Sequence, residues 1–256
     1  MTVSRRQFLM LSGVTLGGVV VYGSLPTALL LYKNNKLDDE QADSAVYQAG
    51  THQWAMIVDI EKCIGCRRCL SACEQENHVP HEPDLYRTWL ERYEMTADGS
   101  LHSELVTGTD LGFEPDNGSL NGFFVPKLCQ QCANPPCVSV CPLNATFRTD
   151  DGVILMDQER CIGCKYCVVA CPYGARFLNP ETLVADKCTF CYHRITKGLP
   201  TACVQACPTG ARSFGDLMDS NDPVRQRLLD ESLQVLKPSL GTKPRVYYTG
   251  LREGVH

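Results

Sequence analysis

Sixteen cysteines in a chain of 256 residues restrict the possible folds of this sequence more than any other feature. They fall into four groups of four, and no cysteine is left over. Cysteine at this density indicates disulfides, zinc sites or iron–sulfur clusters. The remaining composition, with 44% hydrophobic and 21% charged residues, is ordinary for a folded soluble protein. The spacing of the cysteines therefore has to decide among the three.

The spacing inside the groups is that of bacterial ferredoxins. Two groups read C-x2-C-x2-C-x3-C; these are motif 1, with Cys63, Cys66, Cys69 and Cys73, and motif 3, with Cys161, Cys164, Cys167 and Cys171. Two groups have a wider middle gap; these are motif 2, with Cys129, Cys132, Cys137 and Cys141, and motif 4, with Cys188, Cys191, Cys203 and Cys207. A proline follows the last cysteine of every motif except motif 1.

Iron–sulfur clusters explain this pattern better than the two alternatives. Disulfides give no reason for a C-x2-C-x2-C-x3-C-P run. Zinc prefers two separated C-x-x-C pairs, so motifs 2 and 4 alone would fit a zinc site, whereas motifs 1 and 3 do not. A zinc-built structural module is thus the rival interpretation from another functional class.

The ferredoxin spacing has a physical reason. Three cysteines separated by two residues each let a tight loop wrap one corner of a cubane cluster. Gly65 and Gly163 lie inside such loops, where the backbone must approach inorganic sulfur closely. The fourth cysteine leaves the loop and reaches the other cluster of a pair. The spacing therefore predicts an exchange of cysteines within a module, without specifying which motifs are paired.

An internal repeat surrounds the motifs. A short apolar run precedes each of them, at 56–59, 123–125, 153–157 and 183–186. Similar exit sequences follow three of them: CPLNATF from Cys141, CPYGARF from Cys171 and CPTGARSF from Cys207. Each unit predicts a strand, a cluster loop, a short helix, a turn and a strand. We therefore predict an α+β fold of two bacterial-ferredoxin-like modules, each with two [4Fe–4S] clusters, with inserted loops and an N-terminal apolar helix.

Further segments carry a family resemblance. They are the run from Cys161 to Cys171, KCTFC from Lys187, PPC from Pro135 and PTAC from Pro200. With these segments the chain resembles the four-cluster iron–sulfur (beta) electron-transfer subunits of the dimethyl-sulfoxide-reductase family over about residues 54–250. Exported subunits of the tetrathionate, polysulfide and thiosulfate reductase type are the most similar.

The resemblance implies how the sixteen cysteines would bind four [4Fe–4S] clusters. Motifs 1 and 4 would exchange their fourth cysteines, and motifs 2 and 3 would do the same. The implied sets are site 1 (Cys63, Cys66, Cys69, Cys207), site 2 (Cys73, Cys188, Cys191, Cys203), site 3 (Cys129, Cys132, Cys137, Cys171) and site 4 (Cys141, Cys161, Cys164, Cys167).

The resemblance also implies a subunit that transfers electrons without catalysis of its own. It would relay them between a multi-span quinol-binding membrane subunit and a large catalytic oxidoreductase subunit with a molybdopterin cofactor. The alternative is a ferredoxin-like subunit of a membrane redox complex without a pterin enzyme, which serves a multihaem cytochrome or a sulfur-cycle complex. The sequence shows no nucleophile–base set, phosphate loop or dinucleotide fingerprint. A net charge of −5 without a basic block argues against nucleic acid as a partner.

Residues 1–33 predict a targeting segment. SRRQFLM from Ser4 resembles the twin-arginine export signal, and the 25 residues from Phe8 to Tyr32 carry no charge. A membrane-spanning helix needs about 20 apolar residues, so a retained anchor is the alternative to a cleaved signal. An ordinary buried helix fits the paired arginines less well. A protein exported in the folded state would bind its clusters before export. Its cysteines would then not reach an oxidising compartment as bare thiols. We expect a protein on the periplasmic side, associated with the membrane surface.

The rest of the chain divides at the motifs. We predict a linker at 34–53, motif 1 with a surface insertion at 54–128, a ferredoxin module with motifs 2 and 3 at 129–182, and motif 4 with a C-terminal extension at 183–256. In the insertion, residues 86–93 predict a strand, and the polar stretch after them favours a variable surface loop. The alternative is a segment that covers a cluster or contacts a partner.

Five side chains lie near the cluster loops in the sequence. They would either offset the negative charge of clusters or contact a partner, and the alternative is ordinary solvated charge. These residues are Lys165, Tyr166, Arg176, Arg194 and Arg212.

Overall fold

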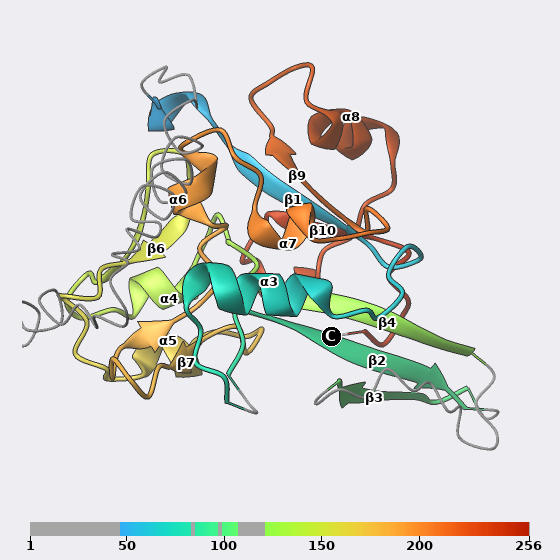
Figure 1. The fold of residues 1–256 in the computed structure, drawn as a ribbon, viewed down its shortest axis with the longest axis horizontal. Helices are drawn as coiled ribbons and strands as arrows, with labels where there is room; N and C mark the ends of the chain where they lie inside the picture. Colours follow the sequence, from blue (N-terminus) through green and yellow to red (C-terminus); the bar gives the residue numbers. More distant parts are fainter. Residues whose placement is uncertain (1–46, 83–84, 97–98, 107–120, 256) are drawn as a thin grey trace, which may run out of the picture. The chain divides into compact units, whose positions relative to one another are not determined.

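The computed structural model describes residues 47–82, 85–96, 99–106 and 121–255 (Figure 1). The predicted signal or anchor at 1–33, with its apolar helix, lies outside these residues, as do most of the predicted linker and the stretch at 107–120. All described elements belong to one unit that begins at Val46. This unit contains both helices and strands, which confirms the predicted mixture of helix and strand.

Strand β1 (Trp54–Asp59) is the middle strand of a three-stranded sheet. It forms from the apolar run before motif 1, and residues 55–58 are completely buried, as expected of a strand with a continuous apolar sequence. β1 pairs in parallel with β10 (Val246–Thr249) and antiparallel with β9 (Arg212–Asp216). Because β9 follows motif 4, this sheet places the start of motif 1 beside the end of motif 4.

Two short hairpins connect successive motifs. β5 (Thr146–Arg148) pairs antiparallel with β6 (Ile154–Met156) between motifs 2 and 3. β7 (Phe177–Leu178) pairs antiparallel with β8 (Ala185–Asp186) between motifs 3 and 4. The strands lie in the exit sequences and in the apolar runs of the repeat, so the predicted strands on both sides of motif 3 are confirmed.

The insertion after motif 1 contributes a sheet of its own. β2 (Thr88–Met95) lies between β3 (Leu101–Leu105) and β4 (Asn121–Leu128), and both pairings are antiparallel. The strand predicted at 86–93 is confirmed, with both ends two residues later in the chain. The prediction of a loop directly after it is wrong for residues 101–105, because these residues pair with β2 along its second half.

A short helix begins inside every cysteine motif. These helices are α3 (Arg68–Asn77), α4 (Pro136–Ser139), α5 (Tyr166–Val169) and α7 (Ala202–Gln205), and α6 (Tyr192–Ile195) lies in the wide gap of motif 4. α4, α5 and α7 end just before a Cys-Pro pair, because proline has no N–H to continue the hydrogen-bond ladder. Motif 1 lacks this proline, and α3 continues to Asn77.

The motif helices pack in pairs (Figure 1). α3 of motif 1 contacts α7 of motif 4, and α4 of motif 2 contacts α5 of motif 3. Together with the β1–β9 pairing, these contacts place motif 1 next to motif 4 and motif 2 next to motif 3.

The C-terminal extension closes the unit. α8 (Pro223–Asp230) packs Val224 against the buried face of β1. Beyond the short 3-10 helix η2 (Pro238–Leu240), the chain runs along motif 2, where the N–H of Arg245 donates to the carbonyl oxygen of Gln130 at 2.9 Å. A second 3-10 helix, η1 (Ala49–Thr51), precedes β1. Within the described ranges, no helix has the length and apolar character to cross a bilayer.

Candidate metal centres

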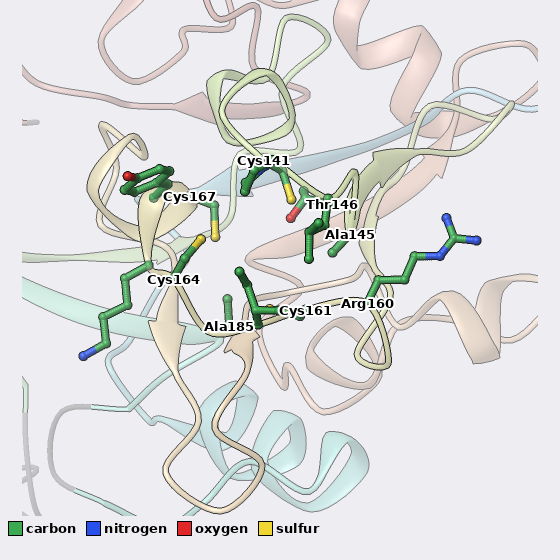
Figure 2. Close-up of a pocket in the computed structure, with 13 residues that line it drawn as sticks. Cys141, Ala145, Thr146, Arg160, Cys161, Cys164, Cys167 and Ala185 are labelled. Atoms are coloured by element: carbon green, nitrogen blue, oxygen red, sulfur yellow. The ribbon is translucent and has the colours of Figure 1, made fainter.

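Four cysteines from two motifs surround one cavity (Figure 2). Cys161, Cys164 and Cys167 come from motif 3, and Cys141 comes from motif 2. Figure 2 shows the sulfur atoms of Cys141, Cys164 and Cys167 turned toward a common space. Its cysteines are those that the family resemblance assigns to site 4.

A second cavity joins motifs 1 and 4. Cys63, Cys66, Cys69 and Cys207 line it. Burial raises the pKa of the Cys63 thiol to about 11, while a hydrogen bond from the backbone N–H of Gly65 opposes this rise. These are the cysteines that the resemblance assigns to site 1.

The site 2 cysteines lie together in a more deeply buried position. Burial raises the pKa of the Cys73 thiol well above its ordinary value, and the adjacent thiols of Cys188, Cys203 and Cys191 raise it further. The side-chain amide of Asn77 lies 3.5 Å from the sulfur of Cys73 and 3.8 Å from the sulfur of Cys191. An amide donor at this distance stabilises a thiolate, because it donates to the charged form.

The site 3 cysteines are grouped in the same way. Burial raises the pKa of the Cys132 thiol to about 12, and Cys129, Cys137 and Cys171 lie close enough to raise it further. Thr242 of the C-terminal extension acts in the opposite direction through a hydrogen bond. Each of the four sets thus combines three cysteines of one motif with one cysteine of another.

These sets fit an iron–sulfur cluster. All donors are thiols, which suit soft metal centres such as iron–sulfur clusters and zinc. At sites 1 and 4 the thiols stand around a cavity. In the described part of the chain, no three His, Cys, Asp or Glu side chains converge on the position of one metal ion.

The exit sequences wrap the backbone around the fourth cysteine. At Cys141, burial raises the pKa of the thiol, but the N–H groups of three following residues donate to its sulfur and bring the pKa below its ordinary value. This requires a sharp turn, and Asn144 provides it with a φ of 52°. Gly174 and Gly210 occupy the same place in the other two exit sequences, with φ of 63° and 65°. The recurring Gly or Asn is therefore required by a left-handed backbone.

The loop glycines are required by space as well as by conformation. A side chain on Gly163, whose φ is 67°, would lie 2.4 Å from the carbonyl oxygen of Leu183. A side chain on Gly65, whose φ is 72°, would lie 2.6 Å from the ring of Phe124. Both loops are therefore packed against a neighbouring chain segment, which holds the cysteines in place.

The insertion covers site 1. Leu90 of β2 and Pro126 of β4 line the site 1 cavity, and Phe124 of β4 packs on the Gly65 loop. The favoured prediction of a plain surface loop is therefore wrong for this part of the insertion, and the alternative of a covering segment describes it. Site 4 differs, because the side chain of Cys164 is exposed.

The five side chains singled out near the loops separate into two groups. Arg176 and Arg212 are only 4% and 3% exposed, so the alternative of solvated charge is wrong for them. Lys165 and Tyr166 are exposed, and Arg194 forms an ion pair with a carboxylate of α3 at 2.6 Å.

Sequence reasoning missed a buried polar junction between motifs 2 and 4. The ammonium group of Lys187, 1% exposed, donates to the carbonyl oxygens of Cys188, at 2.8 Å, and Ile154. Gln131 joins the same two residues: its Nε2 donates to the Cys188 carbonyl at 2.7 Å, and its Oε1 accepts from the Ile154 N–H at 2.8 Å. The available signal was a lysine between a buried apolar run and a cysteine loop.

Known proteins show the same cysteine framework. Residues 120–217, which contain motifs 2 to 4, match the family described as 4Fe-4S dicluster domain, and residues 54–75, which contain motif 1, match the 4Fe-4S binding domain. A tetrathionate reductase subunit of Salmonella typhimurium is 43% identical over 78% of this chain and 73% of its own length. This chain belongs to the iron–sulfur subunits of the dimethyl-sulfoxide-reductase family. The resemblance seen in the sequence is therefore confirmed.

Two further relatives of this iron–sulfur subunit bear on its role. The thiosulfate reductase electron transfer subunit of Salmonella typhi is 40% identical over 66% of this chain and 79% of its own length. The Hdr-like menaquinol oxidoreductase iron-sulfur subunit 1 of Archaeoglobus fulgidus is 31% identical over 97% of this chain and 98% of its own length. The chain is an iron–sulfur electron-transfer subunit, and its domains bind [4Fe–4S] clusters.

Proposed function

We propose that this subunit binds four [4Fe–4S] clusters through all sixteen cysteines, distributed over sites 1 to 4. The observation that carries this proposal is the pair of cavities at sites 1 and 4, each lined by three cysteines of one motif and the fourth cysteine of another. Each cluster would supply one-electron chemistry, and the polypeptide supplies its ligands, burial and hydrogen bonds. The chain would have no substrate site of its own.

The test is a count of iron and acid-labile sulfide in anaerobically purified full-length protein, with EPR after dithionite reduction. We expect about sixteen irons per chain, since each cubane holds four, and no signal of an oxidised [3Fe–4S] cluster. A colourless protein with stoichiometric zinc would overturn the proposal, as would an iron content that fills only one ferredoxin module.

For the partners, we infer a catalytic reductase subunit with a molybdopterin cofactor and a quinol-binding membrane subunit. Support comes from the relatives, because the tetrathionate reductase and thiosulfate reductase subunits are by name parts of reductases. The twin-arginine-like segment at Ser4–Met10 supports export in the folded state to the periplasmic face of the membrane.

One observation favours a second candidate, a membrane redox complex without a pterin enzyme. The menaquinol oxidoreductase relative covers 97% of this chain, so its likeness extends into the N-terminal segment, whereas the two reductase relatives cover 78% and 66%. In that case, the chain would serve a quinol-oxidising complex with a cytochrome partner.

Purification from native membranes with a C-terminal tag distinguishes the two candidates. A co-purifying large subunit with molybdenum or tungsten supports the reductase, and a haem absorption band without either metal supports the second complex. The double variant Arg5→Lys, Arg6→Lys tests export: we expect the iron-loaded protein to remain in the cytoplasm. Periplasmic accumulation of this variant would contradict the twin-arginine route.

A further inference from the structure

Three buried cations lie among the four sets of cysteines. Arg176, Lys187 and Arg212 are 4%, 1% and 3% exposed. Among the ion pairs of the described residues, none joins any of these three side chains to a carboxylate. A buried charge without a partner is strongly unfavourable in a folded protein. Their counter-charge must therefore come from another source.

Arg212 lies between sites 1 and 2. It lines the site 1 cavity, and the thiols that act most strongly on its charge are Cys69 of site 1 and Cys203 of site 2. One guanidinium nitrogen, Nη2, donates to the hydroxyl of Thr88 at 2.8 Å. Its Nε and Nη1 are buried without a hydrogen-bond partner, so they are free to donate toward sulfur.

Arg176 lies between sites 3 and 4 in an equivalent way. Its Nη2 donates to the sulfur of Cys137 of site 3 at 3.2 Å, and its Nη1 donates to the hydroxyl of Thr146 at 3.2 Å. Cys129 of site 3 and Cys167 of site 4 are the other thiols that act on its charge. Its Nε is also buried without a partner.

Lys187 lies between sites 2 and 3, where the two pairs of motifs meet. Burial lowers the pKa of its ammonium group, and the thiols of Cys129 and Cys137 of site 3 and Cys188 of site 2 oppose this effect. Its ammonium group is held by the Cys188 and Ile154 carbonyl oxygens, which are dipoles and not charges. The negative charge that offsets it would come from the two adjacent sites.

We propose that each of these buried cations fixes one positive charge between two successive sites. Arg212 does so between sites 1 and 2, Lys187 between sites 2 and 3, and Arg176 between sites 3 and 4. The physical reason is that reduction adds negative charge to a site whose neighbour is already negative. Repulsion of this kind is strong in a poorly screened interior, and a buried cation between the two offsets it. The inference rests on the proposed four-cluster content. It predicts that each cation raises the reduction potentials of the two sites that it separates.

Lys187→Met is the decisive variant, because it removes the charge and keeps an unbranched side chain only one atom shorter. The protein is purified anaerobically at full length, and its reduction is followed by EPR in a redox titration. We expect the potentials of two of the four clusters to become more negative by at least 59 mV, a tenfold change for a one-electron couple. Lys62→Met is the matched control: this lysine also directly precedes the first cysteine of a motif, but its side chain is 55% exposed and pairs with Asp59, and we expect no comparable shift.

A second pair of variants keeps the test independent of Lys187. Arg176→Gln should lower two potentials, and Arg176→Lys, which keeps the charge, should restore them; a purely structural role would not distinguish the two. Iron-loaded Lys187→Met and Arg176→Gln proteins with unchanged potentials would overturn the inference. So would failure of both to bind iron while Lys62→Met binds it fully, because the cations would then serve assembly. A wild-type chain without four clusters would refute the proposed function instead.

Discussion

At the scale of single residues, the thiols and the cations are buried together. Burial raises the pKa of Cys188 to about 12, so at neutral pH this thiol is protonated in the absence of metal, and cluster binding must displace the proton. The same burial gives Arg176 and Arg212 a poorly screened environment, and the adjacent thiols outweigh this desolvation and raise the pKa of both guanidinium groups. Anionic ligands and cations therefore stabilise each other in the same interior.

The carboxylate of Asp216 joins the end of β9 to the start of β1. It accepts from the N–H groups of Gln53 at 2.7 Å and Met218 at 2.9 Å, and from His52 at 2.7 Å. We expect Asp216→Ala to lower the free energy of unfolding by about 1–3 kcal/mol, because two backbone donors lose their acceptor. Urea denaturation at pH 7 measures it, and a variant as stable as the wild type would contradict the assignment.

The same carboxylate has a defined pH dependence. Burial raises the pKa of Asp216, but the hydrogen bonds from Gln53, Met218 and His52 outweigh this and bring it below its ordinary value of 3.8. A lowered folded-state pKa means that the stabilisation is complete above 3.8 and is lost as the pH falls through the folded-state pKa. The difference in the free energy of unfolding between wild type and Asp216→Ala should therefore shrink as the pH falls below 3.8.

Gly163 and Gly174 form a matched pair of left-handed glycines. Alanine at Gly174, which has no neighbour within 4 Å, should cost only about 1 kcal/mol for the backbone conformation. Alanine at Gly163 would also meet the Leu183 carbonyl oxygen at 2.4 Å and displace the motif 3 loop. We expect Gly163→Ala to lose about four irons per chain, the content of one cubane, as measured by iron analysis. Equal iron content in the two variants would contradict this reason.

At the scale of elements, the differences between the four units have identifiable causes. Motif 1 has no proline after its fourth cysteine, and α3 therefore continues to Asn77, whose side-chain amide reaches two sulfur atoms of site 2. The insertion follows this longer helix, and its strands β2 and β4 return over site 1. One end of the series of sites is therefore covered by a sheet, whereas Cys164 at the other end is exposed.

The sheet of the insertion should protect site 1 from solvent. We expect Phe124→Ala to make one cluster unstable in air, because the ring that packs on the Gly65 loop is removed. The loss of iron and of visible absorbance over time measures this effect. Phe147→Ala is the matched control. This phenylalanine is 39% exposed on β5 and lies outside the loops of motifs 1 and 3. Equal stability of the two variants in air would show that the sheet does not protect the site.

At the scale of the whole molecule, the cysteine sites hold together segments that are distant in the sequence. Site 1 combines cysteines from position 63 to position 207, and the apolar core around β1 includes Cys129, Cys132, Cys188 and Cys203 themselves. Strands such as β7 and β8, with two residues each, are too short to specify the fold by their hydrogen bonds alone. Metal binding and folding should therefore be coupled.

Removal of iron tests this coupling. We expect that oxidation and chelation will lower the melting temperature by at least about 10 °C, since a loss of 1 kcal/mol corresponds to about 2–4 °C in a domain of this size. Near-UV circular dichroism should lose its fine structure at the same time. An apoprotein that melts cooperatively at the temperature of the loaded protein would show that the polypeptide folds without its clusters.

The sequence by itself determined the features that depend on local spacing. The C-x2-C-x2-C-x3-C runs identified the type of metal centre, the apolar runs predicted β1, β6 and β8, and the exit sequences predicted the turns around the fourth cysteines. These features follow from contacts between residues close in the chain, and such contacts require particular residue types at a regular spacing in the sequence.

Only the tertiary structure decided the features that depend on residues distant in the sequence. The β1–β9 pairing and the α3–α7 contact place motif 1 beside motif 4, which spacing alone left open. The cover of β2 and β4 over site 1 and the burial of Lys187 also had no local pattern to reveal them. Whether a lysine faces water or a group of thiols depends on which segments pack around it, and that is a property of the folded chain as a whole.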